Sequence, residues 1–349
     1  MMQQEGDIRY YDYDRCGRLL RERDGEGGVT RYFHNRNGEL VKIVDADNYD
    51  AASDDGAGYT FTYDEMGRPD TVRDAMGVLC EANIYDTTGN ITGRYDSLGM
   101  LARYGYDLGG RQTAVYTGMD NSPVRTSTYD SLGNITSTVD GEGNRTDFEL
   151  DAWGRITGIT CPDGSRETYT YDAAGNITSA TDGNGNVTRY AYNSMMKVGE
   201  VTDQSGSSDK FTYDAEGNRT THTDRNGRLV HREYASFGRL LYEEGEDGTF
   251  RRMRYDAGGR VTRRASNHVE YCYDYTKGGR LKTKYLNGRP VLGYTYTKAG
   301  RVASITDICG ITTYYSYDVN GRLTAVSEKG RTLAAYTYDT AGRVEGIRY

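Results

Sequence analysis

The stretch Tyr-Thr-Tyr-Asp-Ala-Ala-Gly-Asn-Ile, residues 169–177, decides how this chain folds. Tyr169 and Tyr171 stand two residues apart, so in a strand both rings lie on one face. Asp172 and Gly175 then form a D-x-x-G turn, in which the aspartate accepts backbone N–H bonds and the glycine takes a positive φ without a Cβ clash. The stretch predicts a β-strand that ends in a type I turn closed by a left-handed residue, a common hairpin connection.

The same pattern recurs along the whole chain. Sixteen copies align on the residue before D-x-x-G, fourteen of these residues are Tyr, and eleven of the fifteen intervals are 21 residues long. A glycine stands four positions later in every copy except that of Met196. A second turn follows in each copy, as in Asp140–Gly143. A fixed period of this kind indicates tandem β-hairpin repeats with about thirty-two antiparallel strands. The aligned residues are Tyr13, His34, Tyr63, Tyr85, Tyr106, Tyr129, Leu150, Tyr171, Tyr192, Tyr213, Tyr234, Tyr255, Tyr275, Tyr296, Tyr317 and Tyr338.

The aspartates and glycines of the first turns are predicted to be structural. Each aspartate is expected to hold its turn by accepting backbone N–H bonds, and each glycine to take the left-handed position. The predicted turn residues are Asp14, Gly17, Asp64, Gly67, Asp86, Gly89, Asp130, Gly133, Asp172, Gly175, Asp214, Gly217, Asp256, Gly259, Asp318, Gly321, Asp339 and Gly342.

The strand after each turn leaves two interpretations open. In Leu323–Val326 and Val302–Ile305 the two apolar residues stand three apart. A flat strand would send such a pair to opposite faces. Either a bulge follows the turn glycine, or both faces of the sheet are partly covered.

The number of strands limits the architecture. At roughly 4.8 Å per strand, thirty-two strands would make a sheet about 150 Å wide, and open sheets rarely exceed about ten strands without curling or splitting. We therefore expect an all-β protein whose long sheet curls and spirals into a hollow, partial or complete shell. The alternative is an eight-bladed propeller, but a blade needs four unequal strands and these hairpins are too alike.

The chain is expected to be a single domain over residues 1–349. The interval from His34 to Tyr63 is 29 residues, and the extra residues form an acidic loop insertion near residues 45–58. Only 36% of the residues are hydrophobic, a share that could mean disorder, but 33 Tyr and only 4 Pro argue for a folded array.

Charge and segment composition exclude several classes of partner. The net charge is −8 and no basic stripe is present, so nucleic acid is not expected as a partner. No signal peptide is recognised at the start of the chain, and no apolar run approaches the ~20 residues of a membrane span, so this segment is not expected to insert into a membrane. The five cysteines lack disulfide or zinc spacing and are interpreted as small residues within strands.

No catalytic, cofactor or metal site is predicted. The four histidines, at 34, 222, 231 and 268, lie far apart in the sequence and form no triad or ligand pattern. Asp182–Asn186 resembles the opening of an EF-hand loop, but Val187 and Asn193 stand where that loop needs glycine and glutamate. Turn chemistry alone explains the aspartates.

The tyrosine face has two interpretations. In the first it is the sheet core, with rings that stack along one face and hydroxyls that bond to neighbouring strands or to the turn aspartates. In the second, exposed rings form a platform for sugars. Carbohydrate-binding hairpin modules depend on Trp, and this chain has only Trp153.

The motif Y-D-x-x-G-[RN]-[LIV], as in 171–177 and 317–323, resembles the YD or RHS (rearrangement hot spot) repeat along nearly the whole chain. The resemblance implies a β-sheet that spirals into a hollow shell. In bacterial polymorphic toxins and insecticidal toxin complexes such a shell encloses a toxic C-terminal domain, in teneurins it serves adhesion, and in wall-associated bacterial relatives it belongs to contact-dependent competition.

The resemblance has a limit. The segment with self-cleaving aspartates and the effector that follow the repeats in toxin-bearing members are not found here, so neither self-cleavage nor toxicity is carried over. The chain is expected to be either a repeat-only member or a piece of a longer secreted or cell-surface protein. Its partner is then a polypeptide cargo (a toxin domain, absent here) or, alternatively, a cell-surface glycan or protein.

Overall fold

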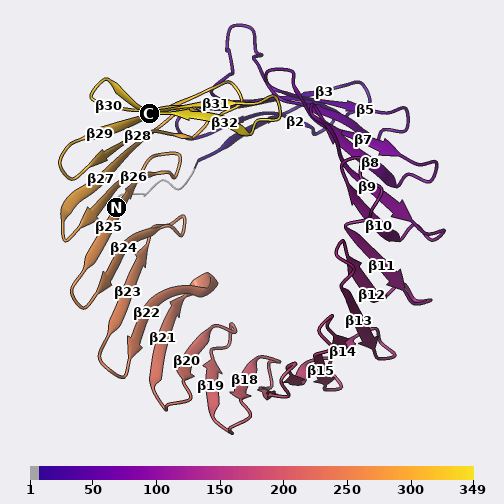
Figure 1. Cartoon of the computed structure of the whole chain (residues 1–349). Helices are drawn as coiled ribbons and strands as arrows, with labels where there is room; N and C mark the ends of the chain where they lie inside the picture. Colours follow the sequence, from indigo (N-terminus) through magenta and orange to yellow (C-terminus); the bar gives the residue numbers. More distant parts are fainter. Residues whose placement is uncertain (1–7) are drawn as a thin grey trace. The chain divides into compact units, whose positions relative to one another are not determined.

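The computed structural model describes residues 8–349 and contains one antiparallel β-sheet of 32 strands (Figure 1). In these residues the only helical element is the 3-10 turn η1 (Ser236–Gly238). The first sixteen strands are β1 (Tyr10–Tyr13), β2 (Leu19–Arg23), β3 (Val29–His34), β4 (Leu40–Val44), β5 (Tyr59–Tyr63), β6 (Pro69–Arg73), β7 (Leu79–Tyr85), β8 (Ile91–Asp96), β9 (Gly99–Tyr106), β10 (Gln112–Thr117), β11 (Arg125–Tyr129), β12 (Ile135–Asp140), β13 (Arg145–Leu150), β14 (Ile156–Thr160), β15 (Arg166–Tyr171) and β16 (Ile177–Thr181). The others are β17 (Val187–Tyr192), β18 (Val198–Thr202), β19 (Ser208–Tyr213), β20 (Arg219–Thr223), β21 (Leu229–Ala235), β22 (Arg239–Gly245), β23 (Phe250–Tyr255), β24 (Val261–Ser266), β25 (Glu270–Tyr275), β26 (Leu281–Leu286), β27 (Arg289–Tyr296), β28 (Val302–Asp307), β29 (Thr312–Tyr317), β30 (Leu323–Glu328), β31 (Arg331–Tyr338) and β32 (Val344–Arg348).

The predicted all-β array is confirmed. Each repeat contributes two strands, and strands that follow one another along the chain pair with each other. The sheet is not divided into blades, so the propeller alternative is wrong. In the described residues β1 pairs with β2 and β32 with β31, which leaves the sheet open at its ends.

A bulge follows the turn glycine, which decides between the two interpretations of the second strand. Tyr171 pairs with Ile177, but Thr170 pairs with Ser179, so one residue is extra on β16. The shift places Ala180 opposite Tyr169. Because paired residues point to the same face, the apolar pair three residues apart lies entirely on the tyrosine face. The same shift recurs in β28, β30 and β32.

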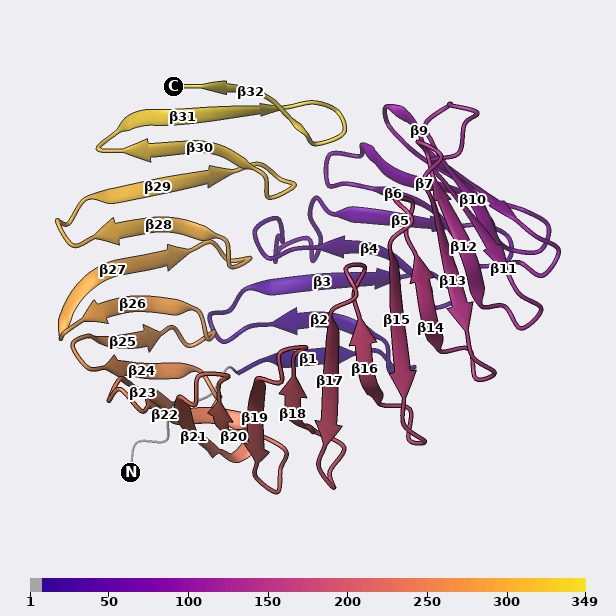
Figure 2. The same ribbon diagram turned by 60° about the horizontal axis from the view of Figure 1, so that its bottom comes forward.

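The residue contacts group into two compact units. Unit 1 comprises Met1–Asp86, Gly93–Leu101 and Met253–Tyr349, and unit 2 comprises Thr87–Thr92 and Ala102–Arg252. Within unit 1, β2–β5 lie beside strands from the C-terminal third of the chain (Figure 2). Within unit 2, the hairpins succeed one another along the sheet in chain order. The single domain over residues 1–349 stays a prediction.

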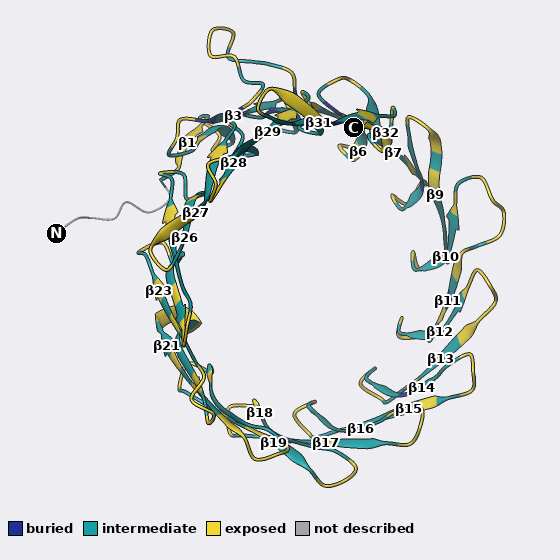
Figure 3. Ribbon diagram, turned by 60° about the vertical axis from the view of Figure 1, so that its left-hand side comes forward, coloured by how far each residue is buried: buried dark blue, intermediate teal, exposed yellow. Residues whose placement is uncertain are grey.

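Few residues of the sheet are buried. In residues 8–349 the only buried hydrophobic residues are Val44, Ala46, Ala82 and Ala334. The strands are mostly half-buried and the hairpin ends are exposed (Figure 3). A sheet of this kind depends on contacts between neighbouring repeats for its stability.

Most repeat tyrosines are held by the preceding repeat. The Tyr171 hydroxyl donates to the carbonyl of Ile156 at 2.6 Å, and the guanidinium of Arg155 lies 4.5 Å from the centre of the Tyr171 ring. Arg155 also donates from Nε to Oδ2 of Asp151 at 2.7 Å. Predicted hydroxyl bonds to neighbouring strands are thus confirmed, but the predicted ring-on-ring stacking is wrong, because an arginine covers the ring. The same hydroxyl bond is made by Tyr106, Tyr192, Tyr213, Tyr234, Tyr296, Tyr317 and Tyr338.

The acidic insertion at residues 45–58 lies between β4 and β5 and is fastened to the sheet. Asp54 accepts hydrogen bonds from Tyr49, Arg21 and Arg31 at 2.8, 3.1 and 3.2 Å. The hydrogen bond from Arg21 is the main cause that lowers the pKa of Asp54 to about 2. The insertion is therefore part of the folded unit.

The cysteines do not all lie in strands. Cys80 and Cys272 do, but Cys16, Cys161 and Cys309 lie in turns, so that part of the prediction is wrong. All five are free thiols. Cys16 and Cys309 stand at the third position of their turns and Cys161 takes the place of the turn aspartate, positions that strand patterning does not address.

Candidate functional site at the hairpin turns

The structure places the predicted turn residues in one repeated geometry. Asp172 Oδ1 accepts the backbone N–H of Ala174 at 2.9 Å and of Asn176 at 2.8 Å. Gly175 donates its N–H to the Asp172 carbonyl at 3.1 Å and has a φ of 90°, a conformation in which a Cβ would be strained. These turns, which follow the repeat tyrosine, are called first turns below.

The other predicted residues share this arrangement. The carboxylate accepts the backbone N–H four residues later in Asp14, Asp64, Asp130, Asp214, Asp256, Asp318 and Asp339. Asp86 lies in the corresponding turn after β7. A positive φ is found at Gly17, Gly67, Gly89, Gly133, Gly217, Gly259, Gly321 and Gly342.

Hydrogen bonds in the turns lower the pKa of the aspartates. For Asp172 the main cause is the side-chain amide of Asn176, followed by the backbone N–H of the same residue. For Asp14 the main cause that lowers the pKa is the backbone N–H of Arg18. The pKa is also lowered at Asp64, Asp130, Asp214, Asp256 and Asp339.

We expect acid to destabilise the protein through these groups. A carboxyl whose folded pKa is below its unfolded value of about 3.9 contributes stability above that value and loses it as the pH falls toward the folded pKa. The midpoint of thermal unfolding should therefore change little between pH 7 and about 5 and fall steeply below about pH 4. Thermal melts across this range test the expectation, and a midpoint that is maintained at pH 3 would contradict it.

Met196 occupies the left-handed turn position without being a glycine. Its φ is 59°, and its N–H donates to the Asn193 carbonyl at 3.0 Å, so the turn is retained. A non-glycine residue in this conformation costs roughly 1 kcal/mol.

Replacement of Met196 by glycine should relieve that strain. The greater flexibility of the unfolded chain offsets part of the gain, so we expect a net stabilisation below about 1 kcal/mol. Denaturant melts of the two proteins measure the difference. A loss of more than about 1 kcal/mol would instead show that the Met195–Met196 side chains make a stabilising apolar contact.

The turns do not assemble a recognisable reaction centre. His222 Nε2 lies 2.9 Å from Asp209 Oδ1, and Arg225 donates to the same carboxylate, which makes this an ion-pair cluster between strands. In residues 8–349 no group of three or more His, Cys, Asp or Glu side chains is placed to hold a metal ion. No helix of that same segment is long and apolar enough to cross a membrane.

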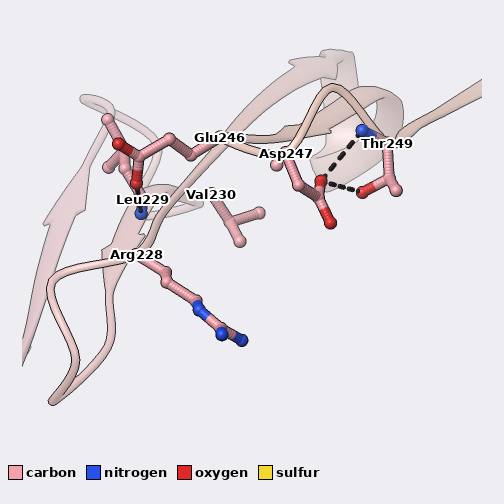
Figure 4. A pocket seen from close by; sticks show the side chains of 7 residues that line it. Arg228, Leu229, Val230, Glu246, Asp247 and Thr249 are labelled. Carbon is pink, nitrogen blue, oxygen red and sulfur yellow. Dashed lines mark hydrogen bonds between the residues drawn. The ribbon is translucent and has the colours of Figure 1, made fainter.

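One pocket of about 460 Å³ lies between two turns of unit 2 (Figure 4). Its lining includes Arg228, Glu246, Asp247 and Thr249. Asp247 accepts hydrogen bonds from the backbone N–H and the hydroxyl of Thr249 at 2.9 and 2.6 Å, and Glu246 donates its N–H to the Leu229 carbonyl at 3.0 Å. The Asp247 carboxylate therefore serves its own turn, and the pocket shows no constellation for catalysis.

The most distinctive contacts lie inside unit 1, where turns far apart in sequence meet. Second turns, those that follow the even-numbered strands, contact first turns more than 240 residues later. We call these contacts the turn seam. It joins the turns after β2, β4, β6 and β8 to those after β25, β27, β29 and β31 (Figure 2).

Two arginines form ion pairs across the turn seam. Arg280 donates to Asp24 at 2.7 Å and to Glu26 at 2.6 Å. Arg301 donates to Asp45 at 2.8 Å and to Asp47 at 2.6 Å. Burial alone would lower the pKa of Arg301, but its hydrogen bonds to the two aspartates raise it overall. Each guanidinium thus binds a pair of carboxylates in a half-buried setting.

In both repeats a substitution removes the turn aspartate with which the arginine would otherwise pair. In seven of the ten repeats with an arginine at this position, the arginine pairs with the turn aspartate four residues earlier, as Arg155 does with Asp151. Thr276 and Thr297 replace that aspartate before Arg280 and Arg301. Sequence reasoning missed this site. The available signal was the consecutive loss of two turn aspartates with both arginines retained.

The remaining seam contacts are close and polar. Asn320 donates to Asp74 at 2.5 Å and accepts the N–H of Ala75 at 2.9 Å. Asn48 donates to the Val319 carbonyl at 2.7 Å. A Cβ on Gly25 would lie 2.7 Å from the Lys277 carbonyl, so the two backbones approach as closely as glycine permits.

Two family models match the sequence. The model described as RHS Repeat matches residues 129–166, 296–332 and 317–349. The model described as Teneurin YD-shell matches residues 179–313. No curated protein matches the sequence.

Solved structures share the fold over nearly the whole chain. TcdB2-TccC3-Cdc42 matches with a TM-score of 0.80 and 16% identity over 99% of this chain and 22% of the matched chain. TcdB2-TccC3 without its hypervariable C-terminal region matches with a TM-score of 0.67 and 18% identity over 99% of this chain and 22% of the matched chain. The Tc holotoxin pore of Photorhabdus luminescens matches with a TM-score of 0.56 and 15% identity over 98% of this chain and 22% of the matched chain. This chain thus spans about a fifth of the chains that it matches, and the likeness concerns the fold.

Proposed function

Because this chain carries the repeats of the RHS/YD family, we propose that it is a non-catalytic scaffold that forms part of a wall around a polypeptide cargo. In the toxin-bearing members that the repeats resemble, such a wall encloses a C-terminal toxic domain. Neither self-cleavage nor toxicity is part of the proposal. The cargo is a polypeptide outside residues 1–349.

The turn seam is the observation that carries the proposal. A single β-sheet can wall off a space only if its successive runs are fastened edge to edge. In unit 1, Arg280 and Arg301 fasten turns to carboxylates 254 and 256 residues away in sequence. Backbone contact at Gly25 leaves little space between the two runs. Such a joint suits a wall better than it suits an open binding platform.

The tyrosine face supports the same function. The hydroxyl of Tyr171 bonds to a backbone carbonyl and its ring is covered by Arg155. Rings engaged in this way stabilise the sheet and are poorly available for stacking on sugars. The glycan-binding alternative therefore has less support.

Protection of a fused polypeptide tests the proposal. An unstructured, protease-sensitive reporter is fused after Tyr349, and added protease is used to follow its cleavage. We expect the fused reporter to be cleaved much more slowly than the same reporter on a compact carrier of similar size. Equal cleavage rates would overturn the proposal.

A matched pair of variants identifies the cause of the protection. Arg280→Glu with Arg301→Glu reverses two charges in the seam and should abolish it. Arg145→Glu with Arg166→Glu reverses two exposed arginines that pair with Asp147 and Glu149, and should leave it intact. Circular dichroism is used to check that both variants retain the β-sheet.

A further inference from the structure

The first turns of unit 2 carry a row of exposed apolar side chains. Trp153, Leu132 and Phe237 expose 81%, 77% and 94% of their surface. They occupy the third position of their turns, next to the left-handed residue. Large apolar side chains repeated along one edge indicate an interaction surface. We call this surface the apolar row. Its members are Leu108, Leu132, Trp153, Met195, Met196 and Phe237.

The same turns in unit 1 show what such an edge binds. There the first turns after β25 and β27 are covered by the second turns after β2 and β4. Their central residues are small or basic, as in Lys277-Gly278 and Lys298-Ala299. A Cβ on Gly278 would lie 3.3 Å from the side chain of Glu26. A first-turn edge is thus a surface that receives second turns.

The second turns of unit 2 present the matching chemistry. They are exposed and strongly acidic, and Arg225 is the only basic residue at their centres. The exposed acidic residues, which we call the acidic row, are Asp120, Asp140, Glu142, Asp163, Asp182, Glu246 and Asp247. Second turns in the seam are acidic in the same way, through Asp24, Glu26, Asp45 and Asp47.

A cation stands next to the apolar row, at the turn position of the seam arginines. Lys197 stands at the position of Arg280 and Arg301, and Asn193 replaces the turn aspartate of its repeat. Lys197 is exposed. In the seam, loss of the turn aspartate accompanies binding of carboxylates from a second turn. Lys197 therefore gives this edge one exposed cation that the acidic row can bind.

We propose that the apolar row of one molecule binds the acidic row of a second copy of this chain. The two surfaces are different patches of the same protein, so the contact is heterologous and can continue from copy to copy. The buried apolar side chains supply the stabilisation, and Lys197 selects the acidic partner. The turn seam has Gly278 and Ala299 at the third turn position, where the apolar row has Trp153 and Phe237, so this contact is made through side chains and not by close backbone approach.

Sedimentation velocity of the whole chain over a range of concentrations tests the proposal. The wild type should associate in a concentration-dependent way and form species larger than a dimer. Trp153→Ser with Phe237→Ser removes the two aromatic side chains of the apolar row and should weaken association by about tenfold or more. Glu142→Lys with Glu246→Lys reverses part of the acidic row and should do the same. Ile308→Ser, which removes an exposed apolar side chain elsewhere, should leave association unchanged.

Mixing the two double variants gives the decisive result. Each retains one intact row, so an equimolar mixture should form a dimer and nothing larger. A wild type that stays monomeric at every concentration would overturn the proposal. Association that survives both pairs of substitutions, or a mixture that stays monomeric, would overturn it as well.

Discussion

Arg280→Glu combined with Arg301→Glu is expected to lower the free energy of unfolding by several kcal/mol. The arginine side chains are 21% and 27% exposed, and their carboxylate partners are 14% to 30% exposed. Loss of one partner of a buried pair costs about 3–5 kcal/mol, and partial exposure reduces this to roughly 2–3 kcal/mol for each arginine. The substituted glutamates add repulsion from Asp24, Glu26, Asp45 and Asp47.

Urea melts measure the loss, and hydrogen exchange locates it. Amides near residues 24–28 and 45–48 should exchange faster in the double variant, whereas those of unit 2 should change little. The control Arg145→Glu with Arg166→Glu should lie within about 1 kcal/mol of the wild type, because exposed ion pairs contribute little. If the seam variant behaves like this control, Arg280 and Arg301 do not fasten the turn seam.

Tyr171→Ala is expected to have the second largest effect. The substitution removes the hydroxyl bond to Ile156 and the ring beneath Arg155. Truncation of a large core aromatic costs about 3–5 kcal/mol, and half-burial places Tyr171 near the lower limit. Tyr171→Phe, which loses only the hydrogen bond, should cost about 1 kcal/mol.

The matched control is Tyr314→Ala, whose ring is 53% exposed. It should cost less than about 1 kcal/mol. Denaturant melts of the three variants compare these effects. Similar losses for Tyr171→Ala and Tyr314→Ala would show that the repeat tyrosines are not the side chains that hold neighbouring repeats together.

The local fold could be predicted because each turn is specified by its own residues. Asp172 and Gly175 determine the chain reversal, and Tyr169 with Tyr171 determines which face is apolar. The bulge could not be decided in this way. It depends on Ile177 and Ala180 pairing with those tyrosines, and a sequence spacing of three fits two arrangements equally well.

The turn seam was beyond sequence reasoning for a different reason. Asp24 and Arg280 are in contact although 256 residues separate them in the sequence. A single sequence does not indicate which residues that far apart lie side by side. Thr276 by itself is an ordinary turn residue, and its effect depends on Arg280, which binds the distant Asp24. The stacking error has a similar origin, because Arg155 covers a ring that belongs to the next repeat.

Small-angle X-ray scattering of the chain in solution tests the central claim, an enclosing wall, most directly. The proposed wall predicts a pair-distance distribution shifted to longer distances than that of a solid sphere of the same mass, as a hollow particle requires. The distribution of a compact solid sphere would contradict it.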